Sequence, residues 1–239
     1  MPGGSPAWSH AIHSRQLSPP TDGFTMLRVP DNKANRMAAV EALRQGRAVA
    51  YPTDTLYGLG ANAFDAKAVD AIFSIKGRPR TQGLPLLIAS LADLDRVASD
   101  VPSEALALAE RFWPGMLTIV LRCHSALPGA VTGGGETVGI RMSSHPAPRA
   151  LITGLGAPIT GTSANYHASL NPTTSVEVER QLGDDVAMVL DGGPCATSVP
   201  STVLDLTFTP ARIVRAGAIP VKQLREVVAV AEPSGANAP

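Results

Sequence analysis

Three cationic residues fall within five positions of this chain, in the run Lys76-Gly77-Arg78-Pro79-Arg80. A guanidinium binds phosphate through a planar fork, and an ammonium neutralises it as a point charge. Pro79 fixes its own φ and disfavours helix at Arg78, so we expect these side chains to spread from an ordered turn. The run therefore indicates a polyanion site, such as one for a nucleoside triphosphate. A solvent-exposed charged surface is the other interpretation.

A polar segment, Pro52-Thr53-Asp54-Thr55, follows a short apolar run at 48–51, and we expect a tight glycine turn at Gly58 and Gly60. Hydroxyls at a strand end can donate hydrogen bonds to a small polar substrate, or they can bond to their own turn. Residues 58–63 fit the dinucleotide fingerprint only loosely. Cations stand about where that motif needs its acidic residue, so the match is weak.

Further polar residues stand at the ends of other expected strands: Arg141, Ser163, Asn165, Ser201 and Arg215. A guanidinium at a strand end can bind a carboxylate with two hydrogen bonds, and Ser and Asn side chains can bind phosphate or a base. The alternatives are a surface ion pair for the arginine and a simple turn for the Ser/Asn segment. The segment 161–165 is not a hydrolase nucleophile elbow, because asparagine stands where glycine is required.

The composition limits the classes of function. The chain has 239 residues, with 20 Lys and Arg balanced by 20 Asp and Glu, which disfavours a large nucleic-acid surface. Cys123 and Cys195 lack metal-ligand spacing and are expected to be buried, reduced thiols. No apolar run is long enough to span a membrane. We expect a cytoplasmic protein with one domain at 25–231, a disordered extension at 1–24 and a flexible tail at 232–239.

Helical and strand patterns alternate between these ends, which predicts an α/β fold with a twisted, open, mixed β-sheet, flanking helices and ligands in crevices at strand ends. Helices are expected at 34–45, 66–75 (capped by Asp65), 103–112, 146–153, 175–182 and 221–229. Strands are expected at 48–51, 84–89, 117–122, 137–142, 158–162, 187–190, 201–206 and 212–215.

Taken together, these segments resemble the YrdC-like family of threonylcarbamoyl-adenylate synthases, in the single-domain form. The matching pieces are PTDTLYGLG (52–60), IKGRP (75–79) with LPLLI (84–88), RFWPGMLTIVL (111–121), VGIRMSSHP (138–146), PITGTSAN (158–165), STVLDL (201–206) and IVRAGAI (213–219). Each motif is weak alone, but their order and spacing are specific. The resemblance covers residues 34–230.

The resemblance implies a YrdC-like fold with a concave basic cavity. It also implies that the chain condenses L-threonine, bicarbonate and ATP into L-threonylcarbamoyl-AMP and releases pyrophosphate. A downstream transferase would then place the threonylcarbamoyl group on tRNA; weak binding of tRNA by this chain stays open. Mg²⁺ would enter with ATP and be held by its phosphates, without protein side chains as ligands. The implied ATP-binding residues are Lys76, Arg78, Ser163, Asn165 and Arg215, and the implied threonine-binding residues are Thr53, Arg141 and Ser201. Lys76 and Arg78 would stabilise charge electrostatically.

The chain departs from the family pattern at Leu84, Ala89, Ser143 and His167, all in or near the implied threonine pocket. No general base follows from the residues. The alternative function is a related protein that binds nucleotide or RNA without making the adenylate.

Overall fold

The computed structural model describes residues 26–232. The expected extension at 1–24, and all but Glu232 of the expected tail, lie outside these residues. The helices are α1 (Lys33–Arg44), α2 (Ala66–Lys76), α3 (Leu94–Val97), α4 (Ser103–Phe112), α5 (Gly129–Thr132), α6 (Pro146–Leu155), α7 (Ser175–Leu182) and α8 (Val221–Arg225), with 3₁₀ turns η1 (Leu91–Asp93) and η2 (Gly183–Asp185). The strands are β1 (Leu27–Pro30), β2 (Val49–Tyr51), β3 (Gly58–Gly60), β4 (Leu86–Leu87), β5 (Leu117–Arg122), β6 (Thr137–Arg141), β7 (Ile159–Thr160), β8 (Thr162–Ser163), β9 (Met188–Asp191), β10 (Thr202–Asp205) and β11 (Arg212–Arg215).

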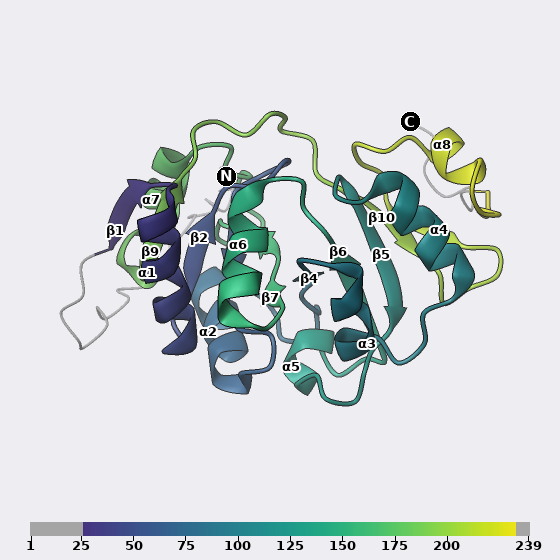
Figure 1. Cartoon of the computed structure of the whole chain (residues 1–239), viewed down its shortest axis with the longest axis horizontal. Coiled ribbons are helices and arrows are strands. Elements are labelled where there is room, and N and C mark those ends of the chain that lie inside the picture. The colour runs from purple at the N-terminus through teal and green to yellow at the C-terminus, as the bar shows by residue number, and fades with distance from the viewer. Residues whose placement is uncertain (1–25, 233–239) are drawn as a thin grey trace, which may run out of the picture.

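The α/β class with mixed strand pairing is confirmed, but the strands form two sheets instead of one. Sheet A has the order β1-β9-β2-β3-β8 and sheet B the order β11-β10-β5-β6-β4-β7. Figure 1 shows sheet A toward the N-terminal colours on the left and sheet B on the right. The expected strand at 158–162 is in fact two strands, because Gly161 carries the chain from the edge of sheet B to the edge of sheet A.

Local sequence signals account for the helix boundaries. The Asp65 carboxylate accepts hydrogen bonds from the backbone N–H groups of Lys67 and Ala68, as expected for an N-cap. Gly77 ends α2 in the left-handed region, with φ +60°, where glycine avoids the steric cost that a Cβ would bring. These two signals define the helix that delivers Lys76 and Arg78. No helix within residues 26–232 is both long and apolar enough to cross a membrane.

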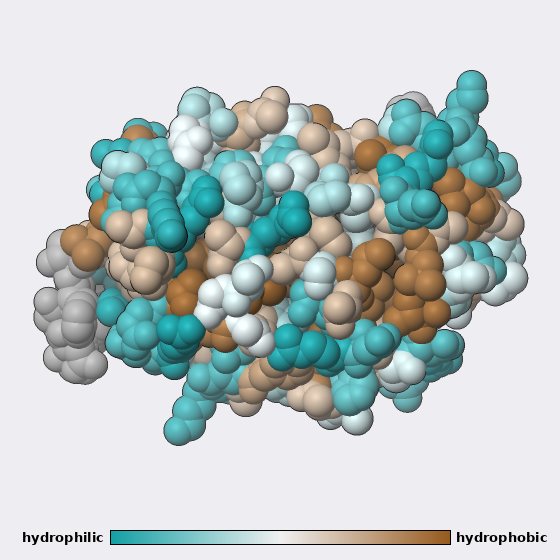
Figure 2. All heavy atoms as spheres, in the orientation of Figure 1, coloured by the Kyte–Doolittle hydropathy of each residue, from teal (hydrophilic) through white to brown (hydrophobic). Residues whose placement is uncertain are grey.

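In sheet B, successive side chains of each strand point to opposite faces, so that one face packs on the core and the other is open. Leu117, Ile119 and Leu121 of β5 are buried in the main hydrophobic core, whereas Thr118 and Val120 point to the other side, where a cavity lies. Helices α1 and α6 pack beside each other on the face seen in Figure 1. In Figure 2 that surface is largely hydrophilic or neutral, with a hydrophobic patch beside the region of α4.

The expected glycine turn at Gly58 and Gly60 is wrong: both glycines belong to strand β3, paired antiparallel with β2. The Tyr51 ring lies over them, and a Cβ built on either glycine would stand 2.6 Å from a ring carbon. The Tyr51 hydroxyl donates a 2.7 Å hydrogen bond to the carbonyl of Thr160, which links the two sheets. The glycines therefore serve close packing rather than a turn.

We expect Gly58→Ala or Gly60→Ala to lower the free energy of unfolding by about 1 to 3 kcal/mol, because the new methyl group would overpack against the fully buried Tyr51 ring. Urea denaturation measures this change. Gly129→Ala is the matched control, since a Cβ there meets no atom within 4 Å. Equal stability of all three variants would contradict the packing role.

Candidate active site

A cavity of about 620 Å³ lies where the edges of the two sheets meet, within the size range of small-molecule sites. Sheet A and its preceding loop contribute Thr53, Thr55 and Ser163 to the wall. Sheet B contributes Thr118, Arg141, Ser201 and Arg215, and the segment after α2 contributes Arg78. Six of the eight predicted site residues therefore line one cavity: Thr53, Arg78, Arg141, Ser163, Ser201 and Arg215.

The cavity is locally basic although the chain is neutral overall. Its lining among residues 26–232 includes three arginines, Arg78, Arg141 and Arg215, and one acidic residue, Asp205. Three guanidinium groups with one nearby carboxylate favour an anionic ligand, and an enclosed site strengthens that attraction relative to open water. The arrangement suits a polyphosphate or a ligand that carries a phosphate and a carboxylate.

Arg78 is fixed by the turn that follows α2. Its Nε donates to the carbonyl of Gln82 at 3.1 Å, and one terminal nitrogen donates to the carbonyl of Gly83 at 3.0 Å. Burial lowers the pKa of Arg78 from its usual value, but a guanidinium stays protonated in proteins. These two bonds hold one edge of the group, so that its other N–H groups are available to the cavity.

Arg141 occupies the end of β6 and is the centre of a buried network. It donates to the Asp54 carboxylate at 2.6 Å, to the Thr55 hydroxyl at 2.9 Å and to the Gly115 carbonyl at 2.8 Å. A guanidinium has about five N–H groups, so two remain for a ligand. The side chains of Arg141 and Asp54 are only 9% and 7% exposed. The surface ion pair considered from the sequence is thus replaced by a buried one.

Asp54 is held by more than its ion pair. The Ser143 hydroxyl donates a short hydrogen bond to the same carboxylate oxygen that Arg141 contacts, while the second oxygen is buried without a partner among the described residues. Burial alone would raise the pKa of Asp54, but the Arg141 charge and the hydrogen bond from Ser143 outweigh it and lower the pKa. Asp54 therefore remains a carboxylate and anchors Arg141.

Arg215 and Ser201 form a second anchored pair on sheet B. Arg215 donates to the Ser201 carbonyl through Nε at 3.2 Å and through a terminal nitrogen at 2.8 Å, and to the Ser201 hydroxyl at 3.0 Å. That hydroxyl also shares a 2.9 Å hydrogen bond with Thr118. Burial, and to a smaller degree the charge of Arg141, lower the pKa of Arg215. The two arginines therefore face the same part of the cavity.

Of the two roles considered from the sequence for Thr53, the structure shows the hydrogen bonds to its own turn. Its hydroxyl accepts from the backbone N–H groups of Thr55 and Leu56 and donates to the Leu56 carbonyl at 2.6 Å, which organises the loop. Thr53 and Thr55 also line the cavity. The loop that these hydrogen bonds organise therefore places Thr53 and Thr55 in the cavity wall.

Two of the predicted residues, Lys76 and Asn165, do not line the cavity. Lys76 is 3% exposed and Asn165 4% exposed, and they are joined to each other behind Ser163. The three cations at 76–80 consequently divide: Lys76 is internal, Arg78 faces the cavity, and the exposed Arg80 pairs with Asp70. Helix α2 ends at Lys76 and the chain turns at Gly77, so the three side chains reach three different surroundings.

Some residues outside the prediction also form the site. Thr118, Asp205 and Asn171 line the cavity, while Asp54 holds Arg141 and Ser143 in turn holds Asp54. Strand alternation could have placed Thr118, because it points away from the apolar residues of the same strand; the Asp54–Arg141 pairing joins residues 87 positions apart and has no local signal. His145 caps α6 through its Nδ1, and Cys123 and Cys195 are free and partly buried.

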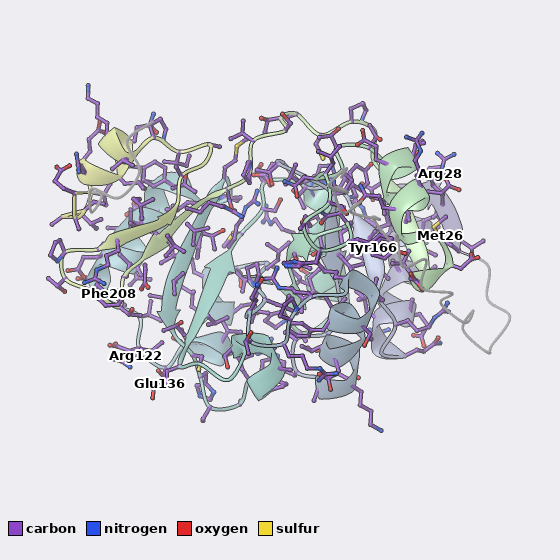
Figure 3. All side chains as sticks on the ribbon, turned by 180° about the vertical axis from the view of Figure 1, so that it is seen from behind. Met26, Arg28, Arg122, Glu136, Tyr166 and Phe208 are labelled. Atoms are coloured by element: carbon purple, nitrogen blue, oxygen red, sulfur yellow. The ribbon has the colours of Figure 1, made fainter. Side chains whose placement is uncertain are left out.

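Figure 3 shows how the surroundings of the cavity are arranged when the molecule is seen from behind. Arg122 and Glu136 lie together at the far end of the β5–β6 hairpin, 3.3 Å apart. Tyr166, in the loop that follows Asn165, lies on the side of sheet A, and its hydroxyl donates to Asp185 at 3.2 Å.

Known proteins resemble this chain in sequence and fold. Residues 41–217 match the model of the Sua5/YciO/YrdC family, which is described as telomere recombination. A threonylcarbamoyl-AMP synthase of Pyrococcus abyssi is 41% identical over 78% of this chain and 55% of its own length, and one of Bacillus subtilis is 41% identical over 80% and 55%. A putative threonylcarbamoyl-AMP synthase of Mycobacterium tuberculosis is 36% identical over 81% and 89%. The chain thus spans a little over half the length of the first two relatives.

Solved structures agree. Sua5 of P. abyssi complexed with L-threonine superposes with a TM-score of 0.81 at 37% identity, over 87% of this chain and 62% of that one. YciO of Escherichia coli superposes with a TM-score of 0.74 at 28% identity, over 84% of this chain and 98% of that one. With its sequence match covering most of the described residues, the chain belongs to the Sua5/YciO/YrdC family.

Proposed function

We propose that this chain is a threonylcarbamoyl-AMP synthase, which condenses L-threonine, bicarbonate and ATP and releases pyrophosphate. The observation that carries the proposal is the single cavity into which both sheets bring three arginines beside the hydroxyls of Thr53, Ser163 and Ser201. The relatives named for this activity and the Sua5 structure with bound threonine support it.

The cavity has room and charge for both an amino acid and a nucleotide. We assign the triphosphate to Arg78, Ser163 and Arg215, and the threonine carboxylate to the two remaining N–H groups of Arg141. Thr53 and Ser201 would bind the polar groups of threonine. Because Arg141 lies close enough to Arg215 for its charge to help lower the pKa of Arg215, the carboxylate and the α-phosphate would meet between them.

The chemistry requires positioning and charge stabilisation rather than a side-chain nucleophile. The threonine amine attacks the carbon of bicarbonate, and loss of water leaves a carbamate. A carbamate oxygen then attacks the α-phosphorus of ATP, and pyrophosphate departs with the electrons of the broken P–O bond. Both bond-forming steps gather negative charge, which the fixed guanidinium groups stabilise without rearranging.

Mg²⁺ fits this cavity as a companion of ATP. The described residues contain no cluster of three or more His, Cys, Asp or Glu side chains that could hold a metal by themselves, and Asp205 is the one carboxylate in the cavity lining. Mg²⁺ commonly binds substrate phosphates and water with few protein ligands. When bound, it would neutralise the phosphate oxygens. The product would pass to a tRNA threonylcarbamoyl transferase, and the cytoplasmic location stays a prediction.

A pyrophosphate-release assay tests this proposal. We expect release from ATP when bicarbonate and L-threonine are both present, and at most weak release when any other amino acid replaces threonine. Mass spectrometry of the mixture should show threonylcarbamoyl-AMP. Binding of ATP without pyrophosphate release under any of these conditions would instead identify a nucleotide-binding relative that makes no adenylate.

A further inference from the structure

The buried ammonium of Lys76 is bound entirely by protein. Lys76 lies at the C-terminal end of α2, and its Nζ donates to the Ser163 carbonyl, to the Asn165 carbonyl at 2.6 Å and to the Asn165 side-chain oxygen at 3.1 Å. An ammonium has three N–H donors, so these three acceptors use all of them. No donor is left for a ligand in this arrangement.

These bonds hold one turn of the chain from both sides. The Asn165 side-chain oxygen also accepts from the Ser163 hydroxyl at 2.6 Å, and its amide donates to the Ser169 carbonyl at 2.7 Å. The backbone N–H of His167 donates to the Lys76 carbonyl at 2.7 Å. The turn at 163–169 is therefore fastened to the end of α2, and the cavity-lining Ser163 is aimed by residues that lie behind it.

We propose that Lys76 is a positioning residue: its ammonium stays behind the cavity wall, fixes the Ser163–Asn165 turn and does not contact the phosphates. This inference deepens the proposed function and revises the direct ATP contact that the sequence assigned to Lys76. Phosphate contact on this side of the cavity falls to Arg78 and to Ser163, whose hydroxyl would turn from Asn165 to donate to a phosphate oxygen.

The network is built for a charged amine. A neutral amine has only two N–H donors and would leave one of the three buried acceptors without a partner. Burial, and to a smaller degree the charge of Arg78, lower the pKa of Lys76 to about 7. His167 and Tyr166 are the titratable residues on the turn itself. An anion bound beside Arg78 offsets the Arg78 charge, so it favours the ammonium form and tightens the turn.

Lysine NMR tests the inference on the wild-type chain, which has only four lysines: Lys33, Lys67, Lys76 and Lys222. The other three are exposed. With isotope-labelled lysine, we expect one signal to titrate far below the rest in the free protein, and its pKa to rise when inorganic pyrophosphate is added. Lys76→Met serves to assign that signal. If all four signals titrate together near the ordinary lysine pKa, the buried network is wrong.

A double-mutant cycle on pyrophosphate affinity separates positioning from contact. We expect Lys76→Met to weaken binding about tenfold, and Lys76→Met with Asn165→Ala to weaken it by no more than the larger single effect, because both changes release the same turn. Lys67→Met, on the exposed face of α2, should bind like wild type. Additive losses would overturn the proposal. Pyrophosphate binding reports on Lys76 even if the chain makes no adenylate, so the two failures are distinguishable.

Discussion

Arg78→Ala is expected to lower threonine-dependent pyrophosphate release by about a hundredfold or more. Each hydrogen bond to a charged group contributes about 1.5–3 kcal/mol, and two such bonds to a phosphate account for that factor in rate. Truncation removes the ligand contact together with the two hydrogen bonds that the guanidinium donates to the carbonyls of Gln82 and Gly83. Steady-state pyrophosphate release over a range of ATP concentrations measures the effect.

Arg80→Ala is the matched control. Arg80 lies two residues further along the same turn, but it is exposed and paired with Asp70, and it does not line the cavity. Its replacement should leave the rate within about twofold, since exposed ion pairs contribute roughly 0–1 kcal/mol. Comparable losses in both variants would mean that general positive charge, and not the placement of Arg78, supports the reaction.

Asp54→Asn should lower the free energy of unfolding by about 3 to 5 kcal/mol, the usual result of removing one partner of a buried ion pair. The substitution keeps the size of the side chain but leaves the Arg141 guanidinium buried without its counter-charge. In the folded fraction, Arg141 loses its 2.6 Å hydrogen bond to Asp54. We therefore also expect a higher KM for threonine, with a smaller change in the KM for ATP. Urea denaturation and the two KM values measure these effects.

Asp70→Asn is the control for this prediction, because it removes the carboxylate of an exposed ion pair and should cost about 1 kcal/mol at most.

The pH dependence of stability gives a second check on the Asp54–Arg141 pair. The pKa of Asp54 is lowered in the folded chain, so its contribution to stability is present above about pH 4 and is lost as the pH falls through the lowered value. That acid-sensitive part should be absent from Asp54→Asn. An unchanged stability and acid sensitivity would show that the pair contributes nothing.

Local patterns predicted the regular elements well. The sequence places α4 at 103–112 and β5 at 117–122, as the structure does, and it places α2 within one residue, with Asp65 as an explicit start signal. The expected strand at 84–89 is shorter, with β4 only at Leu86–Leu87, and the last helix ends at Arg225. Ends without a cap or a stop residue are set by tertiary contacts that a local pattern does not contain.

The errors come from contacts between distant residues. Gly58 and Gly60 resembled a turn, because the sequence does not show that the Tyr51 ring covers them. Lys76 resembled one more phosphate-binding cation, because its acceptors lie almost 90 positions away on the Ser163–Asn165 turn. The order of the motifs placed six residues around one cavity. It did not show which polar side chains face the cavity and which ones hold the cavity-facing side chains in position.

A crystal structure of the chain with L-threonine and a non-hydrolysable ATP analogue tests most directly whether one cavity binds both substrates. We predict the triphosphate within hydrogen-bond distance of Arg78 and Ser163, the threonine carboxylate on Arg141, and Lys76 still bound to the carbonyls of Ser163 and Asn165. Density for either ligand outside the space between the two sheets, or a carboxylate that avoids Arg141, would contradict the account.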